Sequence, residues 1–209
     1  MRHVVGRFIN ELDGERLRAK AAQWPRTVID VGTGGGTALV RRARREPDTF
    51  FIGVDAAAER MREASHRAAR PQDRGGAYNI NFVAAAADDL PGPLADTADE
   101  VTVVLPWGSL LQGVLSADEA MVRRLVGLLR DGGRLELLLS VEESDLVVGS
   151  PAVDEQRARQ LAADYEGLGL ASEEIRLADG SDIDRLGSSW GRRLGIPERR
   201  QAWILRFNT

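Results

Sequence analysis

Apolar residues along this chain form short runs that alternate with amphipathic stretches, and turn residues separate the two. Runs such as 50–54, and 28–31 where only Asp30 interrupts the run, are typical of buried strands, because they are short and rich in β-branched and aromatic residues. The pattern predicts strands at 27–31, 50–54, 79–85, 100–105, 134–140, 171–177 and 201–207, and a short strand pair over 2–9 that turns at Gly6. It predicts helices at 14–23, 36–46, 57–70, 117–130, 153–167 and 182–194.

Strands that alternate with helices predict a mainly parallel sheet with helices on both faces. We therefore expect an α/β, Rossmann-like fold with a seven-stranded sheet and an N-terminal β-hairpin extension at residues 1–12. The length of 209 residues indicates a single domain over 1–209. Residues 142–152 show neither the spacing of apolar residues typical of a helix nor that typical of a strand, and we expect them to link strand five to the next helix.

The first strand, Val28-Ile29-Asp30-Val31, leads into a glycine loop at Gly32-Thr33-Gly34-Gly35-Gly36, and the second strand ends in Asp55. A glycine loop after strand one and an acid after strand two are typical of a nucleoside cofactor site. The third glycine of the dinucleotide pattern falls on Thr37, and the charge of Asp30 would repel a pyrophosphate. The cation S-adenosylmethionine fits better, with Asp55 accepting hydrogen bonds from its ribose. The alternative is a glycine turn that binds no ligand.

The carboxyl ends of parallel strands meet at one edge of a sheet, which is where ligands bind. The loop at 86–90 follows strand three, so we expect Asp88 or the backbone near Ala87 to face the adenine of the cofactor. For Asp88, an ordinary solvated loop acid is an equally good interpretation.

Two tryptophans mark the predicted substrate side. Strand four ends in Leu105-Pro106-Trp107, and base-modifying methyltransferases place a stacking ring after such a proline. Enzymes that methylate exocyclic amines have Asp or Asn where this chain has Leu105, so a ring nitrogen is the better target. Trp190 lies among small and basic residues, and two tryptophans on different loops can hold a flipped base between them. The alternative for Trp107 is a core tryptophan, whereas Trp190 has few of the apolar neighbours that a core tryptophan usually has.

Composition excludes several other classes of site. There is no cysteine, and the two histidines are far apart in the sequence, so we expect no metal site. No apolar run is long enough to cross a membrane and the N-terminal residues lack a signal-peptide core, so we expect a cytoplasmic protein that binds no membrane. The net charge of −4 does not by itself indicate nucleic-acid binding. The basic residues are almost all arginines, which bind phosphate well but also reflect GC-rich coding.

Three segments, Asp30-Val31-Gly32-Thr33-Gly34, Leu105-Pro106-Trp107-Gly108-Ser109-Leu110-Leu111 and Ser189-Trp190-Gly191-Arg192-Arg193-Leu194, resemble the aminoglycoside-resistance 16S rRNA methyltransferases. The opening Met1-Arg2-His3-Val4-Val5-Gly6 is also similar to that family's hairpin extension. The family modifies N1 of adenine 1408 in the decoding site, within the small ribosomal subunit. The resemblance therefore implies a class I S-adenosylmethionine-dependent fold, S-adenosylmethionine as cofactor, 16S rRNA in the assembled subunit as partner, and action as a monomer.

The resemblance also implies roles for individual residues. The cofactor would contact Asp30, Gly32, Thr33, Gly34, Asp55, Ala87, Asp88, Val104 and Ser109. Trp107 and Trp190 would hold the flipped adenine, and Ser188 would contact the cofactor or position the late loop. The rRNA would be docked by His66, Arg67, Arg157, Arg193, Arg199 and Arg200.

Other interpretations stay open at this point. A tRNA guanine-N7 methyltransferase has a second strand similar to Phe51-Ile52-Gly53-Val54-Asp55, although Pro106-Trp107-Gly108 disfavours it. A small-molecule methyltransferase is disfavoured because no acid–base lid is evident. A non-catalytic RNA-binding protein on the same fold is disfavoured by the intact acids and glycines of the cofactor motif.

Overall fold

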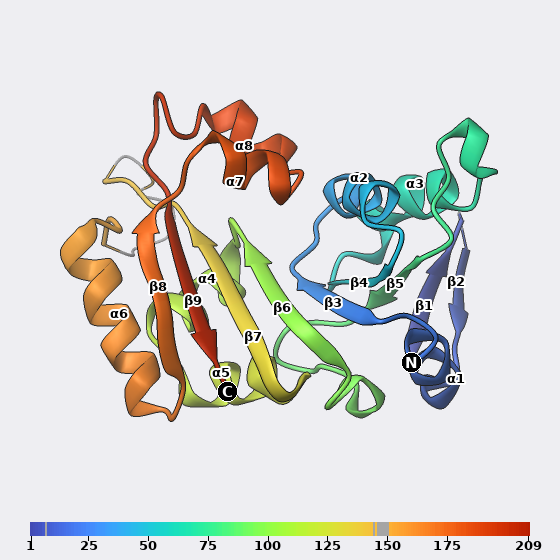
Figure 1. Ribbon diagram of the computed structural model, residues 1–209, viewed down its shortest axis with the longest axis horizontal. Helices are drawn as coiled ribbons and strands as arrows, with labels where there is room; N and C mark the ends of the chain where they lie inside the picture. The colour runs from blue at the N-terminus through green and yellow to red at the C-terminus, as the bar shows by residue number, and fades with distance from the viewer. Residues whose placement is uncertain (7, 144, 146–150) are drawn as a thin grey trace.

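In the computed structural model, which describes residues 1–6, 8–143, 145 and 151–209, nine strands form one sheet in the order β2-β1-β5-β4-β3-β6-β7-β9-β8 (Figure 1). The strands are β1 (Arg2–Val5), β2 (Phe8–Glu11), β3 (Arg26–Val31), β4 (Thr49–Asp55), β5 (Ile80–Ala84), β6 (Ala98–Val104), β7 (Leu129–Leu139), β8 (Ala171–Leu177) and β9 (Trp203–Asn208). Strands β3 to β7 pair in parallel, whereas β9 runs antiparallel between β7 and β8. The expected α/β class with a mainly parallel sheet is confirmed.

The sheet has more strands than the seven predicted, because the N-terminal hairpin is part of it. Strand β1 pairs antiparallel with β5, so that Arg2 lies opposite Ala84 and Val4 lies opposite Phe82. An uncovered strand edge presents unpaired N–H and C=O groups. The hairpin covers that edge of β5, which the sequence pattern of the hairpin alone does not reveal.

The helices are α1 (Gly14–Ala21), α2 (Thr37–Arg45), α3 (Ala58–Ala68), α4 (Gly108–Leu115), α5 (Glu119–Val126), α6 (Glu155–Gly167), α7 (Gly180–Arg185) and α8 (Ser189–Leu194). Two short 3-10 turns, η1 (Gln72–Arg74) and η2 (Gly92–Leu94), lie in loops. The predicted boundaries of α1, α2, α3 and α6 agree with the structure to within a few residues.

The predicted helices at 117–130 and 182–194 were wrong in extent. Helix α5 starts after the cap Asp118, whose side chain accepts from the Met121 amide, and Leu129 already pairs with Ala98 in the sheet. Pairing with β6 therefore overrides the helical pattern beyond Val126. The segment 182–194 is divided at Gly187, whose φ of +67° ends α7 before α8 begins. Helix α4 was not predicted at all.

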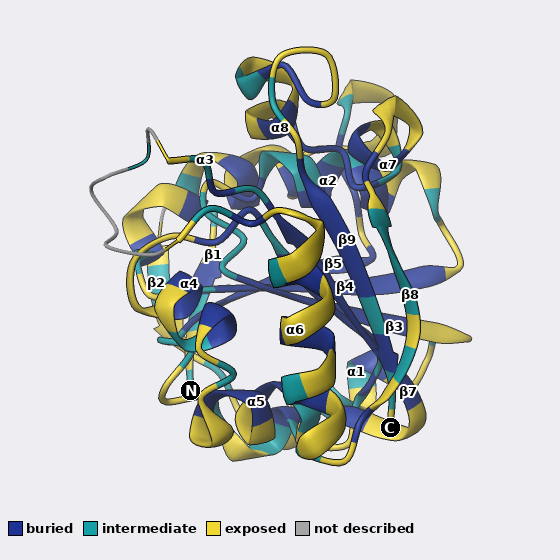
Figure 2. Ribbon diagram, turned by 90° about the vertical axis from the view of Figure 1, so that its left-hand side faces the viewer, coloured by how far each residue is buried: buried dark blue, intermediate teal, exposed yellow. Residues whose placement is uncertain are grey.

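Apolar side chains cover both faces of the sheet. On one face, α2 and α3 pack over β3, β4 and β5, and α7 and α8 pack over the ends of β6, β7 and β9. On the other face, α1, α4, α5 and α6 pack over a larger core. Figure 2 shows the inner strands, such as β4, β5 and β9, dark blue between these layers, whereas the edge strand β8 is teal and yellow and the outward side of α6 is yellow. The ring of Tyr165 in α6 is fully buried and stacks on Phe207 at 4.8 Å between ring centroids.

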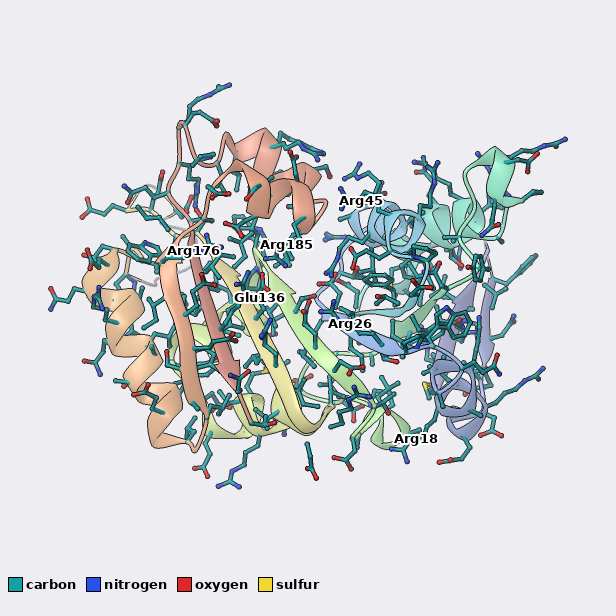
Figure 3. All side chains as sticks on the ribbon, viewed as in Figure 1. Arg18, Arg26, Arg45, Glu136, Arg176 and Arg185 are labelled. Atoms are coloured by element: carbon teal, nitrogen blue, oxygen red, sulfur yellow. The ribbon has the colours of Figure 1, made fainter. Side chains whose placement is uncertain are left out.

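Between the two helix pairs of the first face, ion pairs cover the sheet. Glu100 and Glu136 are only 4% and 2% exposed. Glu100 pairs with Arg26 and lies 3.6 Å from Arg42, and Glu136 pairs with Arg185 and, at 3.1 Å, with Arg206 (Figure 3). Buried carboxylates are tolerated when they are paired in this way. This polar strip reaches Asp30 at the carboxyl end of β3.

Among the described helices, none has the length and apolar character that crossing a bilayer requires. The linker expected over 142–152 falls mostly outside the described residues.

Candidate active site

A cleft of about 770 Å³ opens at the carboxyl ends of β3 and β6. The glycine loop and the first turn of α2 line one side, and the start of α8 lines the other. A smaller cavity of about 250 Å³ lies next to it and shares Gly32, Gly34, Leu105 and Trp107 with the cleft. The two spaces together form an elongated site with the glycine loop at its middle.

The glycine loop has a backbone that other residues rarely adopt. Gly32 and Gly36 have φ of +79° and +68°, and a Cβ on Gly36 would lie 2.4 Å from the ring of Phe82. The amides of Gly32 and Thr33 both donate to the carbonyl of Val54, at 2.8 and 3.1 Å. The loop is therefore fixed to β4, and it keeps its backbone close to the cleft.

Asp30 is a buried carboxylate at the floor of the cleft. Its side chain is 7% exposed, and its Oδ1 accepts a hydrogen bond of 2.7 Å from the hydroxyl of Thr102 on the neighbouring strand. Burial raises the pKa of Asp30, and the Thr102 hydrogen bond and the positive charge of Arg42 offset this only in part. A cationic ligand in the cleft would stabilise the ionised form of this side chain.

Asp55 ends β4 beside the smaller cavity. Its Oδ2 accepts from the Gly34 amide and its Oδ1 from the Ala57 amide, both at 2.8 Å. These bonds hold the carboxylate between the glycine loop and the start of α3. Each oxygen has a second acceptor position, so the carboxylate can still accept from ligand hydroxyls.

The other predicted cofactor residues are divided between the two spaces. Gly32, Thr33, Gly34 and Val104 line the cleft, and Ala87 and Ser109 line the smaller cavity. Asp88 is exposed and lines neither space, which agrees with its interpretation as a solvated loop acid.

Trp107 and Trp190, which are far apart in the sequence, meet at the mouth of the cleft. Their ring centroids lie 6.3 Å apart with the planes at 70°, an edge-to-face contact. They are 53% and 38% exposed, so neither is a core tryptophan. In this edge-to-face contact the two rings are not parallel, and no base fits between them. For a base to stack between them, one ring would have to turn until the two planes are parallel and leave a space.

The turn that exposes Trp107 has a strained backbone. Leu105 has φ of +48°, in the left-handed region that costs roughly 1–3 kcal/mol for a residue with a side chain. Its amide donates to Leu138 at 2.8 Å and its side chain is buried among the residues that α7 covers. Burial therefore holds the strained turn, which directs Pro106 and Trp107 out of the sheet.

The Ser188 side chain caps the N-terminus of α8, two residues before Trp190. It is 5% exposed and accepts from the Gly191 amide at 3.0 Å. It also lines the cleft. The geometry favours a role in positioning Trp190.

The predicted RNA-docking residues differ in their exposure to solvent and in whether they interact with other residues of the protein. His66 and Arg67 are exposed on α3, where Arg67 forms an ion pair of 3.0 Å with Glu63. Arg193 is exposed, lines the cleft and lies 5.3 Å over the ring of Trp190. Arg199 is exposed after α8.

Arg157 and Arg200 do not fit the expected role as phosphate clamps. Arg157 donates to the carbonyl of Leu115 and lies 3.8 Å from Asp164. Arg200 is 11% exposed, donates to the Ser140 hydroxyl at 2.7 Å, and bonds Asp145, where it lowers the pKa of that carboxyl. The guanidinium group of Arg157 binds the end of α4 and a residue of its own helix, and that of Arg200 binds Ser140 and Asp145 after β7, so both groups are engaged within the protein.

Several residues of the site were missed at the sequence level. No local pattern points to Thr102, because only the register of β3 against β6 places its hydroxyl within hydrogen-bonding distance of Asp30. Arg60 lines both the cleft and the smaller cavity, and Arg42 lines the cleft from within α2. Their spacing in arginine-rich helices carried no signal that would separate them from surface charges.

Comparison with known proteins gives a consistent result. The family described as "NpmA: 16S rRNA (adenine(1408)-N(1))-methyltransferase" matches residues 2–209. A 16S rRNA (adenine(1408)-N(1))-methyltransferase of Streptoalloteichus tenebrarius is 33% identical over 199 residues, covering 93% of this chain and 92% of the relative.

Two solved structures extend the likeness to the fold. The aminoglycoside resistance methyltransferase NpmB1 is 35% identical with a TM-score of 0.84, over 100% of this chain and 98% of that one. A variant of the 16S rRNA (adenine(1408)-N(1))-methyltransferase from Catenulisporales acidiphilia, solved with cosubstrate SAM, is 31% identical with a TM-score of 0.87, over 100% and 96% of the two chains.

Proposed function

Because this chain belongs to the 16S rRNA (adenine(1408)-N(1))-methyltransferase family, we propose that it methylates N1 of adenine 1408 in 16S rRNA and so confers aminoglycoside resistance. S-adenosylmethionine is the methyl donor. The observation that supports this best is the pair of exposed tryptophans, Trp107 and Trp190, at the mouth of a cleft with a buried carboxylate at its floor. We further propose one methyltransferase domain that acts as a monomer, in the cytoplasm, on the assembled small subunit.

The residues of the cleft fit this cofactor. The buried carboxylate of Asp30 suits a cationic ligand, and the carboxylate of Asp55 suits ribose hydroxyls. We propose that Gly32, Thr33, Gly34, Val104, Ala87 and Ser109 complete the contacts. When bound, S-adenosylmethionine supplies a methyl group on a positively charged sulfur.

The protein's part in the reaction is positioning. Neutral adenine carries a lone pair and no proton at N1, so no general base is required. The N1 lone pair would form the new bond to the methyl carbon, the electrons of the carbon–sulfur bond would stay on the departing S-adenosylhomocysteine, and the positive charge would pass from sulfur to the adenine. Trp107 and Trp190 would hold the flipped base in line with the methyl group, and alignment of this kind supplies much of the rate. Ser188 would fix Trp190, and Arg193, Arg199, His66 and Arg67 would contact rRNA phosphates.

The test is methylation of purified small ribosomal subunits with labelled S-adenosylmethionine, followed by reverse transcription. We expect a strong stop at adenine 1408, because a methyl group on N1 blocks base pairing. Label elsewhere in the rRNA would contradict the target, and label in purified tRNA instead would support a guanine-N7 enzyme. Failure to bind S-adenosylmethionine in calorimetry would support a non-catalytic protein.

The Thr102 hydroxyl is expected to control how cofactor binding depends on pH. Its hydrogen bond lowers the pKa of Asp30, so Thr102→Val should raise that pKa further. Binding a cation requires the ionised carboxylate. The affinity for S-adenosylmethionine should therefore begin to fall at a higher pH in the variant than in the unmodified protein, as the solution is acidified.

Calorimetry across a pH series measures this shift. Thr97→Val is the matched control, because the Thr97 hydroxyl bonds the Ala95 carbonyl at 3.0 Å and does not line the cleft. Superimposable pH profiles for the Thr102 variant and the unmodified protein would show that Asp30 does not face the cation.

A further inference from the structure

The segment that carries Trp190 is attached to the cofactor-side helix by two arginines. Nη2 of Arg41 in α2 donates to the carbonyl of Gly187 at 2.6 Å. Arg45, one turn further along α2, donates from its two terminal nitrogens to the carbonyls of Asp184 and Arg185, both at 2.9 Å. Asp184 and Arg185 lie in the last turn of α7, where backbone carbonyls have no partner four residues further along the helix, and Gly187 follows the helix. In Figure 3, Arg45 is labelled at the side of α2 that faces α7.

The backbone itself comes close at the same place. Gly187 has φ of +67°, and a Cβ there would lie 2.9 Å from the carbonyl oxygen of Ala38 in the first turn of α2. That turn follows directly from Gly36 of the glycine loop. The chain between α7 and α8 therefore rests on the helix that starts at the cofactor loop, and both segments line the cleft.

Helix α7 has a separate attachment to the sheet. Arg185 pairs with Glu136 of β7, and Arg176 of β8 binds the buried Asp182 through two hydrogen bonds of 2.5 and 2.8 Å (Figure 3). These ion pairs fix the body of α7. They do not reach the turn at Gly187 and Ser188 that leads to Trp190. The amides of Gly187 and Ser188 donate back to α7, to the carbonyls of Asp184 and Ile183 at 3.1 Å each, and α2 holds the other side of the turn through Arg41 and Arg45.

We propose that Arg41 and Arg45 are positioning residues, which hold the Gly187–Trp190 turn on α2 and so set the width of the cleft between cofactor and target base. Through Ser188, the cap of α8, this attachment fixes the direction of the Trp190 ring. The activity readout of this inference rests on the proposed function, whereas its structural readout does not.

Binding of phosphate is the competing role for the same arginines. Arg41, Arg45, Arg67 and Arg192 lie near one another where α2 meets the Gly187–Trp190 turn. Burial, and after it the positive charges of the other three arginines, lowers the pKa of Arg41. Arg192 has a partner in Asp184 at 2.8 Å. Both terminal nitrogens of Arg45 already donate hydrogen bonds to backbone carbonyls and so are not free for phosphate, which favours the positioning role. Arginine suits it, because its planar fork reaches two acceptors at once.

The experiment compares Arg41→Ala/Arg45→Ala with Arg44→Ala, a control on the exposed side of the same helix. Amide hydrogen exchange of the cofactor-bound protein should become faster across residues 186–195 in the double variant only. Turnover of small subunits should fall about 10- to 100-fold, as expected for a misplaced reacting group, while S-adenosylmethionine affinity changes by no more than about twofold. In the exchange assay Arg41→Lys should keep most of the protection, because lysine can replace the single bond of Arg41 to the Gly187 carbonyl. Arg45→Lys should lose protection, because lysine cannot replace the two bonds of Arg45 to the Asp184 and Arg185 carbonyls.

Unchanged exchange across residues 186–195 would overturn the proposal, whatever the activity. Combined with a loss of kcat/KM for small subunits that shrinks as salt is raised, it would show that these arginines bind phosphate, because the variant would have fewer salt-sensitive phosphate contacts to lose. Faster exchange in a protein that methylates no rRNA would support the attachment and count against the proposed function instead.

Discussion

Replacing Trp190 with alanine is expected to reduce methylation of small ribosomal subunits about 10- to 100-fold, because stacking on an aromatic ring stabilises a base by roughly 1–3 kcal/mol. Trp107→Ala should have an effect of the same size. Both rings are exposed at the mouth of the cleft, so their removal should leave the core and the affinity for S-adenosylmethionine nearly unchanged. Single-turnover kinetics and calorimetry measure the two quantities separately.

Phenylalanine at either position is the control, since it keeps an aromatic face. Trp190→Phe should recover most of the turnover lost in Trp190→Ala. Because the two rings now touch at 70°, the double alanine variant should lose more than either single variant. Full activity in both single alanine variants would exclude the arrangement in which the base lies between the two rings.

Asp30→Asn is expected to weaken S-adenosylmethionine binding by at least about 30-fold, because removing one partner of a buried charge pair costs 2 kcal/mol or more. The same change should stabilise the free protein. Burial raises the pKa of Asp30 in the folded state, so the unfolded chain ionises more readily, and the free energy of unfolding falls as pH rises through that raised pKa. Asparagine removes this penalty, and the melting temperature near neutral pH should rise.

Thermal unfolding without ligand tests the expected rise in melting temperature, and calorimetry with S-adenosylmethionine tests the expected loss of affinity. Asp88→Asn is the matched control, because Asp88 is an exposed loop acid and should change neither quantity. An Asp30→Asn protein that binds the cofactor normally would contradict the assignment of Asp30 to the cation. A weaker cofactor affinity in Asp88→Asn would restore Asp88 as a ligand.

The order of the elements and the cofactor motif could be predicted from local patterns. Continuous apolar runs identify strands that are buried on both faces, and a glycine loop after such a strand requires the positive φ values that Gly32 and Gly36 adopt. Asp13 and Asp154 cap helices near the predicted starts, since capping depends on neighbours only a few residues away. The family resemblance rested on the same short segments.

The tertiary structure decided what depends on distant partners. Leu129 joins a strand because β6 is beside it, and the hairpin widens the sheet because the edge of β5 is open to it. Arg157 and Arg200 turn inward because Leu115 and Asp145 lie within their reach. Nothing in the sequence distinguishes these arginines from exposed ones.

The site combines both kinds of information. Asp30, Asp55, Trp107 and Trp190 can be identified as candidates from their neighbours in the chain, namely the glycine loop, the ends of apolar runs, Pro106 and the basic residues after Trp190. Only the fold brought Trp107 against Trp190, placed the Thr102 hydroxyl on Asp30, and put Arg41 and Arg45 on the turn before Trp190. Those contacts join segments far apart in the chain, and the packing of helices and strands, which local propensity does not encode, sets which side chains meet.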